Sequence, residues 1–237
     1  MSRAARWGGM WSGGISEMPI GDFAVGSSVF ANVNGTPREF LIIHQGKPSA
    51  IYDDSCNGTW LMMKDIYETR QWHNSNVNDY AQSTIHSYLN GTFINLFETN
   101  IRNAIKQVKI PYRPGSGTSS SVSSGASGLS AKIFLLSGYE MGWTSSNNQY
   151  FPADGAKVSY FDAGTGTTAN NKRIGYLGGT ATHWWLRSPN TTSSTYAWLV
   201  YTNGSYYNYY CSHSYGVRPA LVLPTNTLVD TSGNIAA

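Results

Sequence analysis

The residues between Asn190 and Tyr215 have the clearest chemical character in the sequence. Outside the apolar patch Ala197–Val200, each of them is Asn, Thr, Ser, Tyr, Gly, Cys or His, and seven are tyrosines. Tyr offers a large ring, a hydroxyl and few rotatable bonds, while Ser, Gly and Asn add hydrogen bonding at little steric cost. Aromatic anchors supply most of the energy in many binding surfaces. The stretch therefore predicts noncovalent recognition of a ligand.

The polar and aromatic side chains of this stretch are expected to contact the ligand. Four neighbouring tyrosines, Tyr206, Tyr207, Tyr209 and Tyr210, are expected to form one exposed surface that can bind protein or glycan faces. The predicted ligand-binding residues are Asn190, Thr192, Ser194, Tyr196, Tyr201, Asn203, Tyr206, Tyr207, Asn208, Tyr209, Tyr210, Ser212, His213 and Tyr215.

The sequence does not predict an enzyme or a cofactor. No G-x-S-x-G nucleophile elbow occurs, and the histidines lack the H-x-x-x-H spacing of zinc sites. Calcium-dependent sugar binding needs converging carboxylates, and no Asp or Glu lies between Pro189 and Leu223. A structural cation near Asp53/Asp54 or Asp154/Asp162 stays an open alternative.

Composition excludes other classes of protein. Only 12% of the residues are charged, against about 25% in average proteins, and 14% are aromatic, which argues against disorder. Lys and Arg are not clustered among the aromatic residues, so we expect no nucleic-acid partner. No run of 18 uncharged apolar residues occurs, and we expect neither a signal peptide nor membrane insertion. Cys56 and Cys211 are interpreted as free thiols.

The elements that must position the site are mostly short strands. An Asn34-Gly35 turn between apolar runs predicts a hairpin. "TWLMMKDIYE" fits a buried strand or a short helix, and "AKIFLLS", "HWWLRS", "AWLVYTNGSYY" and "GVRPALVL" predict further strands. The three expected strands in the first quarter are Ser28–Asn32, Arg38–His44 and Ser49–Tyr52.

Two short helices are expected before the middle of the chain. "NDYAQSTIHSYLNGTFINLF" predicts a helix capped by Asp79, with Tyr80, Ile85 and Leu89 on one face. "ETNIRNAIKQVKIPY" predicts the second, followed by a strand. The Gly/Ser-rich run Gly115–Ser130 is a linker or a surface loop, and we favour the loop. Helices followed by many short strands indicate an α+β fold.

A rigid apolar frame is expected beneath the polar surface. Trp184, Trp185 and Trp198 are interpreted as core residues, with one of the first two as a candidate to face the ligand. Arg187 and Arg218 are interpreted as structural, because an unpaired buried guanidinium is costly. Their expected partners are carbonyl groups or a carboxylate, with Asp154 and Asp162 as candidates.

"KIFLLSGYE", "HWWLRSP" and "YGVRPALVL", with "IHSYLNGTF" upstream, resemble a bacterial and phage domain of C-type-lectin-like fold, of the subtype that includes formylglycine-generating enzymes. The resemblance covers about residues 25–225. It implies a leader or connector over 1–24, a ligand-binding domain over 25–225 with a variable region of about 185–223, and a tail over 226–237. Those oxidases use paired cysteines near the C-terminus, and only Cys211 lies in that region.

The C-terminal segment is also similar to the variable region of proteins that retroelements diversify, such as phage tropism determinants. In those systems adenines of AAY codons are substituted at random, which never yields Lys, Glu, Gln, Met or Trp. Asn190–Tyr196 and Tyr201–Tyr215 obey this rule. The resemblance implies a phage tail protein on the virion that binds a host-surface protein or glycan and assembles with other tail proteins; an oligomer is compatible with it. The alternative is a non-diversified lectin-like or structural module of a bacterial surface or virion protein.

Overall fold

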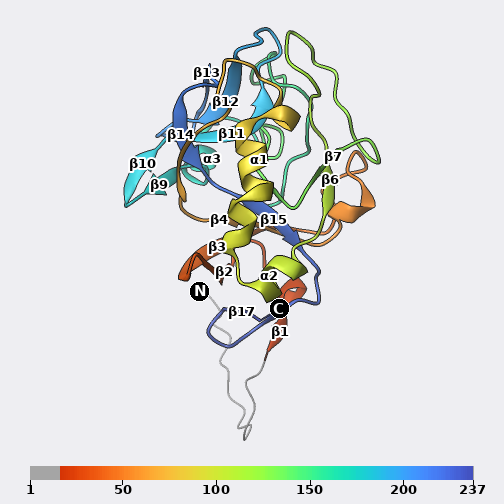
Figure 1. Ribbon diagram of the computed structural model, residues 1–237, viewed down its shortest axis with the longest axis vertical. Coiled ribbons are helices and arrows are strands. Elements are labelled where there is room, and N and C mark those ends of the chain that lie inside the picture. Colours follow the sequence, from red (N-terminus) through yellow and green to blue (C-terminus); the bar gives the residue numbers. More distant parts are fainter. Residues whose placement is uncertain (1–16, 237) are drawn as a thin grey trace, which may run out of the picture.

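The computed structural model describes residues 17–236, so residues 1–16 of the expected leader and Ala237 lie outside the described residues. Two five-stranded sheets dominate the molecule, one above the other in the view of Figure 1. The upper sheet has the order β13-β12-β11-β14-β5 and the lower sheet the order β2-β3-β4-β15-β8. The chain passes from the upper sheet to the lower one between β14 and β15.

The strands of the upper sheet are β5 (Glu68–Gln71), β11 (Trp184–Pro189), β12 (Tyr196–Val200), β13 (Tyr206–Tyr210) and β14 (Ser214–Val217). Those of the lower sheet are β2 (Ser28–Val33), β3 (Thr36–Gln45), β4 (Thr59–Met63), β8 (Ile133–Phe134) and β15 (Ala220–Leu223).

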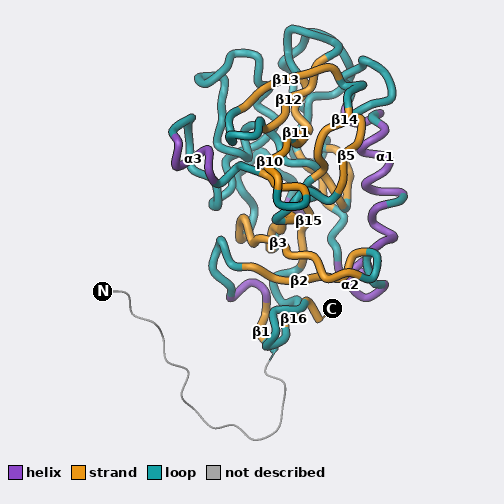
Figure 2. Tube along the Cα trace, turned by 90° about the vertical axis from the view of Figure 1, so that its left-hand side faces the viewer, coloured by secondary structure: helices purple, strands orange, loops and turns teal. Residues whose placement is uncertain are grey.

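Smaller elements surround the two sheets, and the fold is α+β as expected. α1 runs beside β5 and β14 (Figure 2). The described residues form three α-helices, one more than expected: α1 (Thr84–Gly91), α2 (Thr99–Ala104) and α3 (Thr167–Asn171). The 3₁₀ turns are η1 (Ile20–Asp22), η2 (Asp54–Cys56), η3 (Tyr80–Gln82) and η4 (Phe93–Leu96). The remaining strands are β1 (Met18–Pro19), β6 (Val108–Ile110), β7 (Leu129–Ala131), β9 (Gly175–Leu177), β10 (Thr180–Thr182), β16 (Leu228–Val229) and β17 (Ile235–Ala236).

The predicted hairpin and first helix are present, with one change at the cap. Asn34 and Gly35 both have positive φ, as a tight hairpin turn between β2 and β3 requires. Asp79 caps the 3₁₀ turn η3, where its carboxylate accepts from the Ala81 amide. Ser83 caps α1 instead, because its hydroxyl accepts from the amide of His86.

Two other expectations about the N-terminal half are resolved by packing. No strand forms at Ser49–Tyr52; Tyr52 makes only an isolated bridge with Gly125, and its ring is buried. The Gly/Ser-rich run lies against the domain as a loop, since Ser116 Oγ and the Gly117 amide both donate to the side-chain oxygen of Asn78.

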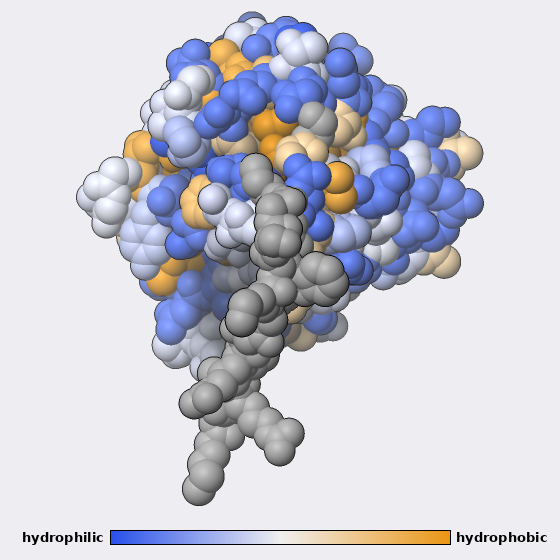
Figure 3. Space-filling view, turned by 90° about the horizontal axis from the view of Figure 1, so that it is seen from below, coloured by the Kyte–Doolittle hydropathy of each residue, from blue (hydrophilic) through white to orange (hydrophobic). Residues whose placement is uncertain are grey.

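The end of the chain packs into the domain. β16 pairs with β1 and with β17 at the lower end, so residues 226–236, expected as a tail, complete a small sheet. Val229 and Ile235 from this segment are buried in the core. In the view from below, the atoms not hidden by the grey trace are mostly hydrophilic, with apolar residues in small groups (Figure 3).

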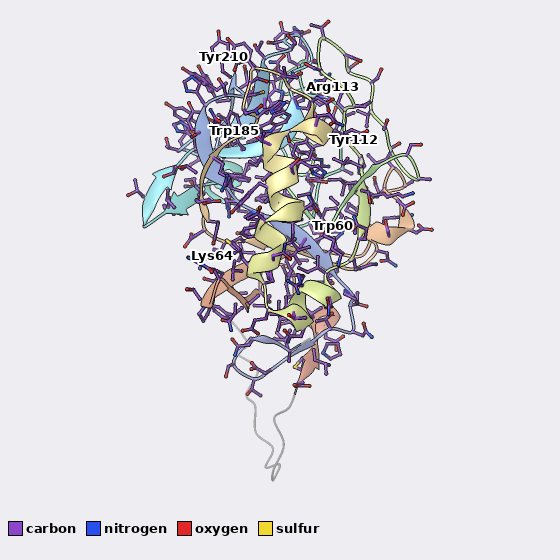
Figure 4. All side chains as sticks on the ribbon, in the orientation of Figure 1. Trp60, Lys64, Tyr112, Arg113, Trp185 and Tyr210 are labelled. Carbon is purple, nitrogen blue, oxygen red and sulfur yellow. The ribbon has the colours of Figure 1, made fainter. Side chains whose placement is uncertain are left out.

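Alternation along β11 and β12 divides the core into two clusters. Trp184, Leu186, Trp198 and Val200 belong to one cluster, while Trp185, Ala197 and Leu199 belong to the other, which includes the buried face of α1. All these side chains are fully buried or nearly so, which confirms the tryptophans as core residues and places neither Trp184 nor Trp185 at the surface. Figure 4 shows Trp185 inside the molecule beside α1 and Tyr210 at its upper edge.

A buried ion pair fixes β11 to the surrounding loops. Arg187 donates from Nη1 and Nη2 to the two carboxylate oxygens of Glu140, at 2.6 and 2.7 Å. Its remaining bonds go to the carbonyls of Pro111, Leu135 and Asp154. Burial by itself lowers the pKa of Arg187, but the Glu140 carboxylate outweighs burial and the net pKa shift is upward. The expected structural role is present, but the carboxylate partner is Glu140 rather than Asp154 or Asp162.

Arg218 is held differently. Its Nε and Nη2 donate to the carbonyls of Met63 and Lys64, and its guanidinium lies 4.6 Å from the ring centroid of Trp184. Burial lowers the pKa of Arg218 to about 10, which still leaves the group charged at neutral pH. Arg218 therefore joins the two sheets through main-chain carbonyls, at the crossing from β14 to β15.

Arg187→Met is expected to lower the free energy of unfolding by about 3–5 kcal/mol, because it leaves the Glu140 carboxylate buried without its counter-charge. Denaturant unfolding measures the loss. Arg187→Met combined with Glu140→Gln should regain part of it, since both charges are then gone and the glutamine still accepts from Tyr52, which is 2.7 Å away. A double variant no more stable than the single one would contradict this account.

Asp154 is fully buried, and its Oδ2 has no hydrogen-bond partner among residues 17–236. Burial raises the pKa of Asp154 to about 7, whereas the pKa of an unfolded aspartate is about 3.9. A raised carboxyl pKa favours folding below the unfolded value, and this contribution is lost as pH rises from about 4 to about 7. The melting temperature of Asp154→Asn should therefore rise relative to that of wild type as pH increases from about 4 to about 7. If the difference in melting temperature between Asp154→Asn and wild type is the same at pH 5 and at pH 8, the assignment is contradicted.

Candidate ligand-binding surface

The stretch of restricted composition folds into the β12–β13 hairpin and its flanking loops. In the hairpin turn the Tyr201 amide donates to the Ser205 carbonyl at 2.7 Å, and Asn203 Oδ1 accepts from the amide and hydroxyl of Ser205. Gly204 has a φ of 79°, and a Cβ there would collide with the main chain of Asn170. The turn is therefore fixed by its own polar residues and by one glycine.

The strand period of two separates the four neighbouring tyrosines onto opposite faces of the sheet. β13 is paired with β12 in continuous register, with Tyr207 opposite Leu199 and Asn208 opposite Trp198. Tyr207 and Tyr209 consequently lie on the face of Leu199, and Tyr206 and Tyr210 lie on the other. The expectation that these four rings form one surface is therefore wrong.

Tyr207 and Tyr209 line an open pocket with a volume of about 470 Å³, here called the aromatic concavity. His183 and Tyr201 have ring centroids 4.2 Å apart, and Tyr209 lies 5.8 Å from Tyr215. The concavity is lined by His183, Leu199, Tyr201, Asn203, Ser205, Tyr207, Tyr209 and Tyr215. Five of these eight residues are predicted ligand-binding residues; His183, Leu199 and Ser205 are not.

His183 enters the concavity through a pairing that the sequence does not reveal. β11 pairs with β14 in parallel, with Trp184 opposite Gly216, which brings His183 to 5.3 Å from Tyr215. The one local signal is alternation, because His183 lies two positions before Trp185 and shares its face of the strand. Ser205 belongs to the turn of the same restricted composition.

None of the eight described residues that line the concavity is an Asp, Glu, Lys or Arg. Burial lowers the pKa of His183, so the imidazole is neutral at pH 7, and burial raises the pKa of Tyr215, so its phenol stays protonated. Residues 17–236 contain no group of three or more His, Cys, Asp or Glu side chains placed to hold a metal ion. What the surface offers is ring faces, hydroxyls and one neutral imidazole, which suit stacking and hydrogen bonding.

Tyr206 is half-buried and packs against the core. Its ring packs edge-on against Trp143, Phe151 and Trp198, with centroids 5.4 to 5.8 Å apart, and its hydroxyl donates to the Asn147 carbonyl at 2.8 Å. Tyr210 lies on the same face but further along the strand and is 39% exposed. Its ring centroid lies 4.5 Å from that of Tyr196. The rings of Tyr196 and Tyr210 form a second, smaller aromatic group at the edge of the sheet.

The loop before β12 combines two buried residues, Asn190 and Thr191, with exposed ones. Asn190 is only 5% exposed, and its Oδ1 accepts from the amide and hydroxyl of Thr192. The amide nitrogen of Asn78 donates to the carbonyls of Asn190, Ser193 and Tyr196, which pins the loop to the domain. Asn190 is therefore not available to a ligand in this structure, whereas Thr192 and Ser194 are exposed.

The segment after β13 places the last predicted residues. His213 is exposed and its ring lies 4.6 Å from Tyr209, beside the aromatic concavity. Ser212 is held by its main chain, whose carbonyl accepts from Gln71. Asn208 is half-buried on the face of Tyr206. Cys211 and Cys56 are buried free thiols, as the sequence predicted, and burial raises the pKa of Cys211 to about 12.

Tyr207→Ser should change the free energy of unfolding by no more than about 0.5 kcal/mol, because the side chain is half exposed and packs only at the surface. Tyr206→Ser should cost about 2 kcal/mol, since it removes a partly buried ring that packs against the aromatic core. Tyr206→Phe isolates the hydroxyl and should cost about 1 kcal/mol. Denaturant titration of the three variants measures the difference, and equal stability of Tyr206→Ser and Tyr207→Ser would show that both rings lie outside the core.

No helix among residues 17–236 is long and apolar enough to span a membrane. No curated protein and no solved structure matches the chain. Residues 57–225, which include both strands of the hairpin, β11, Glu140 and Arg187, match the model of a family described as a domain of unknown function, DUF6273. The match covers most of the chain, and the protein therefore belongs to the DUF6273 family.

Proposed function

We propose that this protein is a ligand-binding display protein whose Tyr/Ser/Asn surface recognises a host-cell-surface protein or glycan as the receptor-binding part of a phage tail. The observation that carries the proposal is the coincidence of restricted composition with the aromatic concavity. Tyr201, Asn203, Tyr207, Tyr209 and Tyr215 obey the AAY rule and line one uncharged concave surface.

The frame beneath the concavity supports a binding role. Leu199 and Trp185 are fully buried under it, and Trp185 lies 5.0 Å from Tyr215. A surface held on a rigid frame loses little conformational entropy on binding, so more of the contact energy appears as affinity. The fixed residues Ala197–Val200 of β12 are buried, so substitutions at Tyr207 and Tyr209 of β13 leave this part of the core unchanged.

The C-type-lectin-like fold of the formylglycine-generating-enzyme-like subtype is part of the same proposal. Its support is the "WWLRSP…GVRPAL" motif together with the structural roles of Arg187 and Arg218 in that motif. The mechanism proposed for it is noncovalent: rings stack on the ligand, hydroxyls donate and accept, and no catalytic residue, metal or cofactor takes part. Location on the virion, with a bacterial cell surface as the alternative, follows from the proposed role.

Tyr207→Ser should weaken binding to a host target by about tenfold or more, because an aromatic anchor at the centre of an interface commonly contributes over 1.4 kcal/mol. The measurement is binding to an array of bacterial envelope proteins and surface glycans. Tyr176→Ser is the matched control, since Tyr176 is 42% exposed against 50% for Tyr207 and lies outside the proposed surface. Equal effects of both substitutions on every array target would contradict the assigned surface.

Sequences of related copies from one lineage separate diversification from the alternative of a fixed module. Diversification requires that differences concentrate between Asn190 and Tyr215 and spare Ala197–Val200. A nearby imperfect DNA repeat that differs only at adenines, with a reverse transcriptase gene beside it, would support it independently. Differences spread evenly along the chain would leave a fixed lectin-like or structural module.

A further inference from the structure

The upper sheet ends at β13, whose second edge is not paired by any strand of the described residues. Two bonds fix the pattern of the hairpin ladder: the Tyr201 amide donates to the Ser205 carbonyl, and the Cys211 amide donates to the Thr195 carbonyl. In an antiparallel pair, bonded residues alternate along the strand. Tyr207 and Tyr209 therefore bond to β12, and the main-chain groups of Tyr206, Asn208 and Tyr210 point away from it.

These outward main-chain groups are largely free. Among residues 17–236, the Tyr210 carbonyl accepts from the His213 amide at 3.0 Å, and no such bond reaches the outward amide or carbonyl of Asn208. The register of β13 on β12 runs without a bulge from Tyr196 opposite Tyr210 to Val200 opposite Tyr206. The edge is therefore straight, and it presents donors and acceptors at the strand spacing.

The two edges of the same sheet differ in their protection. At the other end β5 carries Glu68 and Arg70, whose side chains form an ion pair at 2.7 Å, and the Arg70 guanidinium also lies 3.6 Å from the ring centroid of Tyr88. Charged side chains are a common means of preventing an edge strand from pairing with another chain. β13 reads Tyr-Tyr-Asn-Tyr-Tyr and has no charge, proline or bulge. Within residues 17–236, charged side chains thus protect the β5 edge and not the β13 edge.

The free edge also borders the aromatic concavity. A strand added beside β13 would lie about 4.8 Å from it, with alternate side chains on opposite faces. The side chains on the face of Leu199 would meet the rings of Tyr207 and Tyr209, which line the concavity. Main-chain bonds combined with alternate side-chain contacts are the mode of recognition called β-augmentation.

We propose that β13 binds an extended segment of a ligand protein as a sixth strand of the upper sheet, through the main-chain groups of Tyr206 and Asn208 and the main-chain amide of Tyr210. The proposal rests on the proposed function and deepens it, because it names the ligand as a polypeptide with uncharged side chains at alternate positions. Main-chain bonds at the edge do not depend on which side chains diversification places at positions 207 and 209. Affinity would then be retained while side-chain specificity changes.

The probe is a displayed library of linear peptides of about nine residues, long enough to span a strand, panned against the full chain. We expect selected peptides to bind, and their N-methylation at alternate residues to weaken binding by about tenfold, the equivalent of about one lost hydrogen bond. N-methylation at the intervening residues should have less than about a threefold effect, since those amides point away from β13. This contrast needs no change in the protein.

Protein variants test the same edge from the other side. Asn208→Pro removes the outward amide without removing a ladder bond to β12, and it should weaken peptide binding by about tenfold. Asn208→Ala, which keeps the amide, is the matched control and should bind within about threefold of wild type. Asn208→Lys adds the charge that β13 lacks and should also weaken binding.

Several outcomes would overturn the inference: no library peptide binds, both N-methylation series have the same effect, or glycans are the only array targets bound. Sedimentation that shows a dimer lost in Asn208→Pro would assign the edge to a second copy of this chain instead. If array targets bind in a Tyr207-dependent way while no peptide does, the proposed function stands and only the edge-strand inference fails. If no array target binds either, the proposed function fails with it.

Discussion

The bidentate ion pair between Arg187 and Glu140 is the interaction on which the upper sheet depends. Both side chains are fully buried, and the guanidinium also bonds to carbonyls of three separate loops. Tyr52 and the Ser137 amide satisfy the carboxylate from the other side. Buried charges are tolerated only when such a network is complete. β11, the middle strand of the sheet, is held by this network, and β12 and β13 are built outward from it.

Buried polar groups recur in the loops around β11. Ser188 Oγ donates to Asp154 Oδ1. The side-chain amide of Asn78 donates to three carbonyls, two in the loop before β12 and one at the first residue of β12. Irregular segments carry more main-chain groups that need partners than regular elements do, and they are ordered here by side chains that reach them. The loops can therefore be long and still be held in place by side-chain hydrogen bonds.

The constraint on a diversified surface is that strand alternation sends neighbouring residues to opposite faces of the sheet, and one face can pack against the core. Tyr206 obeys the same compositional rule as Tyr207, yet its ring is partly buried against the core and its hydroxyl donates to a carbonyl. If substitution occurs at position 206, some variants lose stability; at position 207 they lose only contact area. Substitution with equal probability at each codon would thus produce unequal consequences along β13.

The sequence by itself determined the α+β class, the hairpin at Asn34-Gly35, the first helix face and the buried tryptophans, because these depend on local turns and on periodicity over a few residues. It did not determine that Glu140 is the partner of Arg187, or that His183 lies beside Tyr215. Ion-pair partners and parallel strand pairing join residues that are distant in the chain, so local patterns carry no record of them. That Tyr206 packs against the core while Tyr207 is exposed was likewise decided by tertiary structure, since composition is the same on both faces and only packing against Trp143, Phe151 and Trp198 distinguishes Tyr206.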